Sequence, residues 1–327
     1  MLLYSVINIF IFFYFTLNIP NMFEIVLNIS AIIIGLVICI IALIIMIRIL
    51  HYIHFNRIQR DDKVVFIHSM NIYILLFIFM LIINSFTMQS LLGDHYGLEF
   101  DSQWCIFIGF IDPVVFGTLY WNFVNQAFYR FCRIIYFSRS SFQSSWLYFM
   151  LLPIELLLVA ILLSPSLIWR DITYLPREHY CYISVMNVRG AVWIFSFAFG
   201  LPLSCLLMIY LRITLYLQHN TQNQRVLMVR QREQRDLTII RRICVIVSLL
   251  MMLGVPALTI LLISYIQNVE NPYFFRVEWF FVSLSMFGID FALIIFTPQL
   301  KSIFFKRYQQ QVLPVILQTA MEAIPKR

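Results

Sequence analysis

Charged side chains are scarce in this sequence. Asp, Glu, Lys and Arg together make up 12% of its 327 residues, whereas a soluble domain carries about 25%. Apolar residues account for 61% of the chain, and its mean hydropathy is +0.86. So few charges cannot cover the surface of a globular protein of this length. Lipid must therefore be the solvent for most of the chain.

Sequence motifs of catalysis are missing as well. The chain contains no glycine-rich phosphate loop, no paired-cysteine metal motif and no nucleophile elbow. We therefore expect neither an enzyme nor a bound cofactor or metal. Cysteine is also rare, and four of the six cysteines lie in or beside apolar runs, where a reduced thiol acts as a small hydrophobe. These four are Cys39, Cys132, Cys205 and Cys244.

The apolar runs predict an all-α membrane protein with seven transmembrane helices. Each run is long enough to cross a bilayer with some tilt. The expected spans are 25–48, 64–92, 104–136, 146–169, 190–217, 238–267 and 277–299. After them, 300–327 begins with LKSIFFKRYQQQ, whose apolar and basic faces predict a short amphipathic helix on the membrane surface, followed by a tail. The membrane domain would thus cover 25–299.

Residues 1–24 form a separate amino-terminal segment. Its first 20 residues are strongly apolar and carry no charge. They lack the basic start of a signal peptide and are marginal in length for a span. A leader and a hydrophobic extracellular arm both remain open for this segment.

The basic residues predict how the spans are oriented. All but four of the 23 Lys and Arg residues lie in the loops between spans one and two, three and four, and five and six, or in the tail. The four exceptions are Arg170, Arg177, Arg189 and Arg276. Because basic loops stay in the cytoplasm, the amino terminus should be extracellular and the carboxyl terminus cytoplasmic. These loops account for the net charge of +7, so we expect membrane lipid and no nucleic acid as a partner.

The third span has a distinctive pattern of polar residues. It begins with Trp104-Cys105, and Asp112 is its only ionised side chain before Arg130. Cys105 and Arg130 are 25 residues apart, roughly 37 Å in a helix, which places one at each membrane surface. This stretch resembles the third helix of a rhodopsin-like (class A) G-protein-coupled receptor. The alternative is an ordinary buried helix in which the Cys and Arg occur by chance.

The resemblance covers about residues 24–312 and implies a function. Such a receptor sits in the plasma membrane, binds an extracellular ligand between spans three, five, six and seven, and activates a heterotrimeric G protein when span six swings outward. It also implies a disulfide between Cys105 and Cys181, the two cysteines in segments expected outside. Two free thiols are the alternative.

Arg130 matches the arginine that closes the third helix in this family, although Tyr129 replaces the usual neighbouring acid. Asp236 stands where resembling receptors have an acid at the base of helix six. The resemblance therefore implies a resting-state contact between Arg130 and Asp236. A snorkelling arginine at the interface is the alternative.

Three further residues match positions that bend or switch in the family. Pro202 and Tyr210 have the spacing of the fifth-helix proline and tyrosine, and Pro256 matches the sixth-helix proline. Gly254 replaces the family's tryptophan, so a switch built on that ring is not expected. In span seven, Asp290 stands for the Asn of Asn-Pro-x-x-Tyr, but the Pro and Tyr are absent. A sodium site and a proton relay both remain open for Asp290.

Asp112 is the ligand-binding candidate. It lies two helical turns below Cys105, where resembling receptors for amines and some peptides hold an acid against a cationic group. The alternative is an acid bonded within the protein that shapes a kink at Pro113. Glu155, a second acid within a span, has a structural role on our interpretation. The sequence leaves a peptide and an amine equally open as the ligand.

Two other function classes remain alternatives. A transporter or channel would show internal repeats and broken helices in matching halves, and no repeat is found. A receptor-like protein that binds a ligand without coupling fits the missing switch residues. Retinal binding through a Schiff base is excluded, because span seven contains no lysine.

Overall fold

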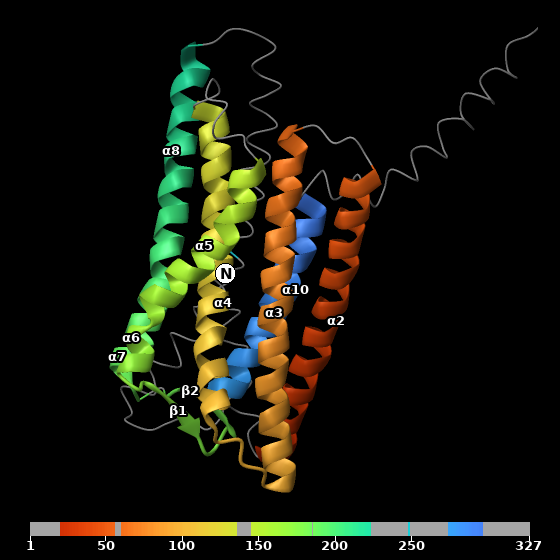
Figure 1. Ribbon diagram of the computed structural model, residues 1–327, viewed down its shortest axis with the longest axis vertical. Coiled ribbons are helices and arrows are strands. Elements are labelled where there is room, and N and C mark those ends of the chain that lie inside the picture. Colours follow the sequence, from red (N-terminus) through yellow and green to blue (C-terminus); the bar gives the residue numbers. More distant parts are fainter. Residues whose placement is uncertain are drawn as a thin grey trace, which may run out of the picture.

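A computed structural model of the chain describes residues 20–55, 60–135, 145–184, 186–223, 248 and 274–296, and its helices run side by side as a bundle (Figure 1). The first three helices are α2 (Pro20–Phe55), α3 (Arg60–Tyr96) and α4 (Gln103–Ile135). They are followed by α5 (Ser145–Leu163) and the short α6 (Pro165–Ile168). Next come strands β1 (Ile172–Leu175) and β2 (Tyr180–Ile183), then α7 (Val188–Ile194), the π-helix η2 (Phe195–Gly200), α8 (Leu201–Asn223) and α10 (Phe274–Phe296).

Six helical segments within the described residues are long and apolar enough to cross a membrane. They are Met22–Phe55, Lys63–Tyr96, Gln103–Tyr129, Leu147–Ile168, Val188–Tyr216 and Phe274–Ile295. They coincide with six of the seven expected spans, and several helices extend past the apolar runs that predicted them. The expected sixth span, 238–267, and the surface helix after 300 lie outside the described residues.

Helix α2 shows how the bundle meets its solvent. It packs against α3 and α10, and Ala42, Ile45 and Ile49 are buried in that contact. Its other face exposes Ile33, Ile40 and other large apolar side chains. Apolar residues on both faces are expected where the surrounding solvent is hydrocarbon, so the structure is that of a membrane-embedded protein.

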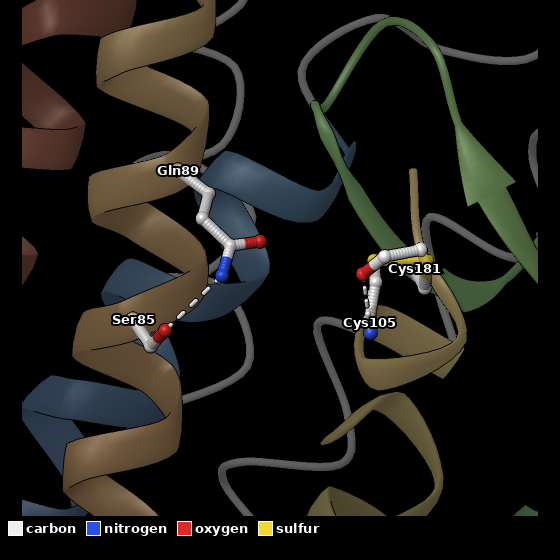
Figure 2. Close-up of a disulfide and its surroundings, with 5 residues drawn as sticks. Ser85, Gln89, Cys105 and Cys181 are labelled. Carbon is white, nitrogen blue, oxygen red and sulfur yellow. Dashed lines mark hydrogen bonds between the residues drawn. A yellow bond between two sulfur atoms is a disulfide. The ribbon is translucent and has the colours of Figure 1, made fainter. Parts of the chain in front are cut away.

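A two-stranded hairpin, which the all-α prediction did not include, covers one end of the bundle. Strands β1 and β2 pair antiparallel, with Tyr174 opposite Cys181. A disulfide joins Cys181 to Cys105 at the start of α4, as the sequence predicted (Figure 2). Gly109 allows this close approach, because a β-carbon at that position would lie 2.4 Å from the carbonyl oxygen of Cys181. We call this the hairpin end of the bundle.

A single buried arginine connects four elements at the hairpin end. The guanidinium of Arg276, in the first turn of α10, forms an ion pair with Glu24 of α2. It also forms a forked pair with Asp94 of α3, at 2.8 Å from Nη1 to Oδ2 and 3.1 Å from Nη2 to Oδ1. Its Nε donates to Glu178, in the turn between the strands, at 3.4 Å. Forked, charge-assisted bonds are the strong kind, so Arg276 holds the hairpin onto three helices.

These contacts correct one expectation from the sequence. Arg276 was placed in an extracellular loop, before a span expected at 277–299, but it lies inside α10 with 4% of its side chain exposed. Asp94 belongs to α3, which extends past the span expected at 64–92, and it pairs with Arg276. Glu99 and Asp101, which follow α3, are exposed.

Replacing Arg276 with Ala should destabilise the fold by about 3–5 kcal/mol, the usual cost of removing one partner from a buried ion pair. The variant would leave three carboxylates close together without their cation. Thermal unfolding of the purified protein in detergent measures this effect. Arg177→Ala is the matched control, because Arg177 lies in the hairpin turn beside Glu178 and is exposed. Equal unfolding temperatures for Arg276→Ala and the parent would contradict the role given to this network.

Candidate functional site

A cavity of about 240 Å³ opens between the hairpin and the helices. Its walls come from α3, α4, β2, α7, η2 and α10. Most of the lining is apolar, and much of it is aromatic, including Phe79, Phe116, Phe195, Phe199, Phe275 and Trp279. Two carboxylates, Asp112 and Glu278, face the same space. A concave, apolar site with a few polar groups is typical of a small-molecule or cofactor pocket.

Asp112 lies in the wall that α4 contributes, next to Pro113 and below the disulfide. Its side chain is buried, with 2% exposed. The hydroxyl of Tyr182 donates a hydrogen bond to its Oδ2 at 3.3 Å, while its Oδ1 has no hydrogen-bond partner among the described residues. A buried carboxylate oxygen without a donor is costly. The internal-bond alternative therefore accounts for one of the two oxygens and leaves the other without a donor among the described residues.

Tyr182 is held in place by an aromatic cluster under the hairpin. Its ring lies edge-on to Trp279 and Phe275, with centroids 5.4 and 5.8 Å away. The indole nitrogen of Trp279 donates to the hydroxyl of Tyr180 at 2.9 Å, and Tyr180 stacks on Phe86 at 4.8 Å. Side chains on a strand stand roughly perpendicular to the sheet. The hairpin therefore directs the ring of Tyr180 toward Phe86 of α3 and the hydroxyl of Tyr182 toward Asp112.

A π-helix that packs against α4 forms another wall of the cavity. Pro202 has no N–H, so the carbonyl four residues earlier loses its usual helical partner. The preceding turn instead closes over five residues, with the N–H of Leu201 donating to the carbonyl of Ser196. This wider turn, Phe195–Gly200, presents Phe195, Ala198 and Phe199 to the cavity. The sequence predicted a backbone irregularity at Pro202 but not its form.

Glu278 is a site residue that the sequence analysis missed. It lies in α10, lines the cavity and is half-buried. Within the described part of the chain it forms no hydrogen bond or ion pair, and its charge acts on Asp112 and on the tyrosines of β2. An ionisable residue within a span is a functional candidate by default. That rule applied to Glu278 would have found it.

The other predicted residues lie away from the cavity or outside the described residues. Asp290 is fully buried in α10 and lies beside the phenol of Tyr73 of α3. Tyr210 is buried in α8. Glu155, expected to be structural, is buried in α5 beside Asn122. No cluster of three or more His, Cys, Asp or Glu able to hold a metal occurs within the described ranges.

The predicted Arg130–Asp236 contact stays a prediction. Arg130 belongs to α4, and its side chain is outside the described part of the structure, as are Asp236 and Pro256. The described helices do place the carboxyl end of α4, where Arg130 lies, opposite the hairpin end (Figure 1). The cavity and Arg130 therefore lie toward opposite ends of one helix.

Comparison with protein-family models gives no match for this chain, and comparison with curated proteins gives none either. Its function is therefore argued from the cavity and the helices that form it.

Glu178 brings a pH-sensitive group next to the site. Burial raises its pKa from 4.5 to about 7, although the guanidinium of Arg276 lowers it. The carboxylates of Asp94 and Glu24 act in the same direction as burial. In an unfolded chain this side chain would release its proton near pH 4.5. Between these two pH values the folded protein holds a proton that the unfolded chain has lost.

The stability contribution of Glu178 should therefore fall as the pH rises from about 4.5 to about 7, by at most about 3 kcal/mol at roughly 1.4 kcal/mol for each pKa unit. Unfolding temperatures of the parent and Glu178→Gln, measured across this range, isolate the effect because other titrating groups are common to both. The advantage of the parent should shrink as the pH rises. A constant difference would show that Glu178 has an ordinary pKa.

Proposed function

We propose that this protein is a rhodopsin-like (class A) G-protein-coupled receptor in the plasma membrane. It binds an extracellular ligand with a cationic group in the cavity between α4, the hairpin, η2 and α10, and it activates a heterotrimeric G protein on the cytoplasmic side. The observation that carries this proposal is Asp112, a buried carboxylate with one oxygen lacking a donor among the described residues, at an aromatic cavity.

The charge distribution supports this orientation of the bundle. Arg48, Lys63 and Arg212 are exposed, and they lie toward the end opposite the hairpin in α2, α3 and α8. The positive-inside rule assigns that end to the cytoplasm. The disulfide at the hairpin end then lies in an oxidising compartment, where such bonds persist. Both observations favour the same direction.

The chemistry of the cavity favours a ligand that combines a cation with an apolar or aromatic body. Asp112 would pair with the cation in surroundings that contain little water, where a charge pair is stronger than in bulk solvent. The faces of Trp279 and the neighbouring phenylalanines would contact the rest of the ligand and attract its charge. A cavity of about 240 Å³ is small for a drug-sized compound. It fits a small amine or one end of a short peptide.

Signal transfer would use the length of α4. Ligand binding at Asp112 changes the packing between α4, η2 and α10, and a π-helix is a frequent point of adjustment within a helix. The resembling receptors convert such a change into an outward swing of span six. In this chain the cytoplasmic end of α4, with Arg130, would then engage the G protein.

Nucleotide exchange on a G protein tests the coupling. Membranes that contain the parent should accelerate exchange with at least one member of a panel of amines and short basic peptides. Arg130→Ala should abolish that response while ligand binding persists. Asp112→Asn should weaken binding at least about tenfold, because it removes a charged hydrogen-bond acceptor, whereas Asp101→Asn, an exposed acid, should leave it unchanged.

Silence of the surface-expressed parent with every ligand and with forced G-protein pairing would overturn the coupling. Binding that depends on Asp112 in a silent parent would identify a receptor-like protein that does not couple.

A further inference from the structure

Two carboxylates from different helices face the same cavity. Asp112 belongs to α4 and Glu278 to α10, and both line the cavity. We propose that the ligand carries two cationic groups, one that pairs with Asp112 and one that pairs with Glu278. This inference rests on the proposed function in one respect, that the cavity is the ligand site.

Among the described residues, no Lys or Arg forms an ion pair with either of these two acids. Arg276, the basic residue nearest to Glu278 along α10, is engaged by Glu24, Asp94 and Glu178. On the hairpin side, Arg189 pairs with Asp171 at 2.5 Å, and Arg170 and Arg177 are exposed.

The sequence also shows where basic residues occur outside the described part of the structure. No Lys, Arg or His occurs between Arg242 and Arg276, or before Arg48. The stretch that includes the expected sixth span therefore has no cation to contribute. The second positive charge that the proposal requires would come from the ligand.

Asp112 offers a cation one carboxylate oxygen at a fixed position in the cavity. Asp112 is almost fully buried, and its Oδ1 has no hydrogen-bond partner among the described residues. Its other oxygen is fixed by the hydroxyl of Tyr182. An isolated buried carboxylate is strongly unfavourable, while one paired with a cation is not. A single ammonium at Asp112 would still leave the charge of Glu278 unmatched.

Aromatic side chains join the two acids. Tyr182 is bonded to Asp112, and its ring lies edge-on to Phe275 and Trp279, which flank Glu278 in α10. The surface between the two carboxylates is therefore apolar and aromatic. It suits a short hydrocarbon linker between two cationic groups, with further attraction from the ring faces.

Two kinds of molecule present this chemistry. One is a small aliphatic diamine. The other is a peptide whose first residue is basic, because the α-ammonium and the side-chain cation then lie a few bonds apart. The cavity of about 240 Å³ admits either the whole diamine or the first residue of the peptide. Matched probes distinguish the two sources.

Thermal stabilisation of the purified full-length protein measures binding without a G protein. The small-molecule pair is 1,5-diaminopentane against pentylamine, and the peptide pair is lysine amide against Nα-acetyl-lysine amide. In at least one pair, the dication should bind at least about tenfold more tightly than the monocation, since it gains one further charged contact. Diamines with two to ten carbons should show an optimum length.

The Glu278→Gln variant tests the assignment of the second charge. It should reduce the affinity for the dication to that for the monocation and leave the monocation unaffected. The exposed acid Glu99 is the matched control, so Glu99→Gln should keep the full preference for the dication. A preference that survives Glu278→Gln would overturn the proposal. So would equal affinity within both pairs, or the absence of stabilisation by all four probes.

Nucleotide exchange with the same probes separates this inference from the proposed function. Dication binding that depends on Glu278 without nucleotide exchange would support two-point recognition and contradict G-protein coupling. Exchange stimulated equally by dications and monocations would support coupling and overturn two-point recognition.

Discussion

The ion-pair network of Arg276 is the constraint on which the candidate site depends. One guanidinium pairs with carboxylates from α2, α3 and the hairpin turn, and those residues are as far as 252 positions away in the sequence. Taking these charges out of water is unfavourable unless every partner is present. The network therefore favours a single arrangement of the four elements. Because Glu278 and Trp279 follow Arg276 within one helical turn, this arrangement also sets where they meet the cavity.

The disulfide completes the positioning from the other side. Cys181 ties β2 to the start of α4, while Arg276 ties the adjacent turn to α10 through Glu178. With the chain anchored at Glu178 and Cys181, Tyr182 of β2 comes within hydrogen-bonding distance of Asp112. The disulfide and the ion pair thus act together. The disulfide keeps β2 close to the start of α4, and the ion pair keeps the hairpin turn close to α10.

The cavity combines an apolar lining with two acid groups that form no ion pair with another described residue. In an apolar lining an unpaired charge has an unfavourable free energy, and it is strongly attracted to an opposite charge. The same physical property therefore gives both affinity and selectivity, because a neutral ligand of the same size leaves the carboxylates without a partner. The π-helix before Pro202 contributes the rings of Phe195 and Phe199 to this lining.

The sequence by itself determined the membrane setting, the position of six helices and the cysteine pair. The membrane setting and the helices are local features, since a bilayer requires long apolar runs whose backbone hydrogen bonds are made within the helix. Asp112 was found for the same reason, because an acid in an apolar run is conspicuous. The cysteine pair is not local, but the resemblance implied it and only these two cysteines lie in segments expected outside. The sequence did not reveal the pairing of Arg276, the hairpin, the π-helix or the meeting of Glu278 with Asp112. Each of these depends on which way a side chain points around its helix and on partners from distant segments. Only the tertiary structure decides those contacts. In it Arg276, an arginine expected in a loop, is buried at the centre of the ion-pair network at the hairpin end.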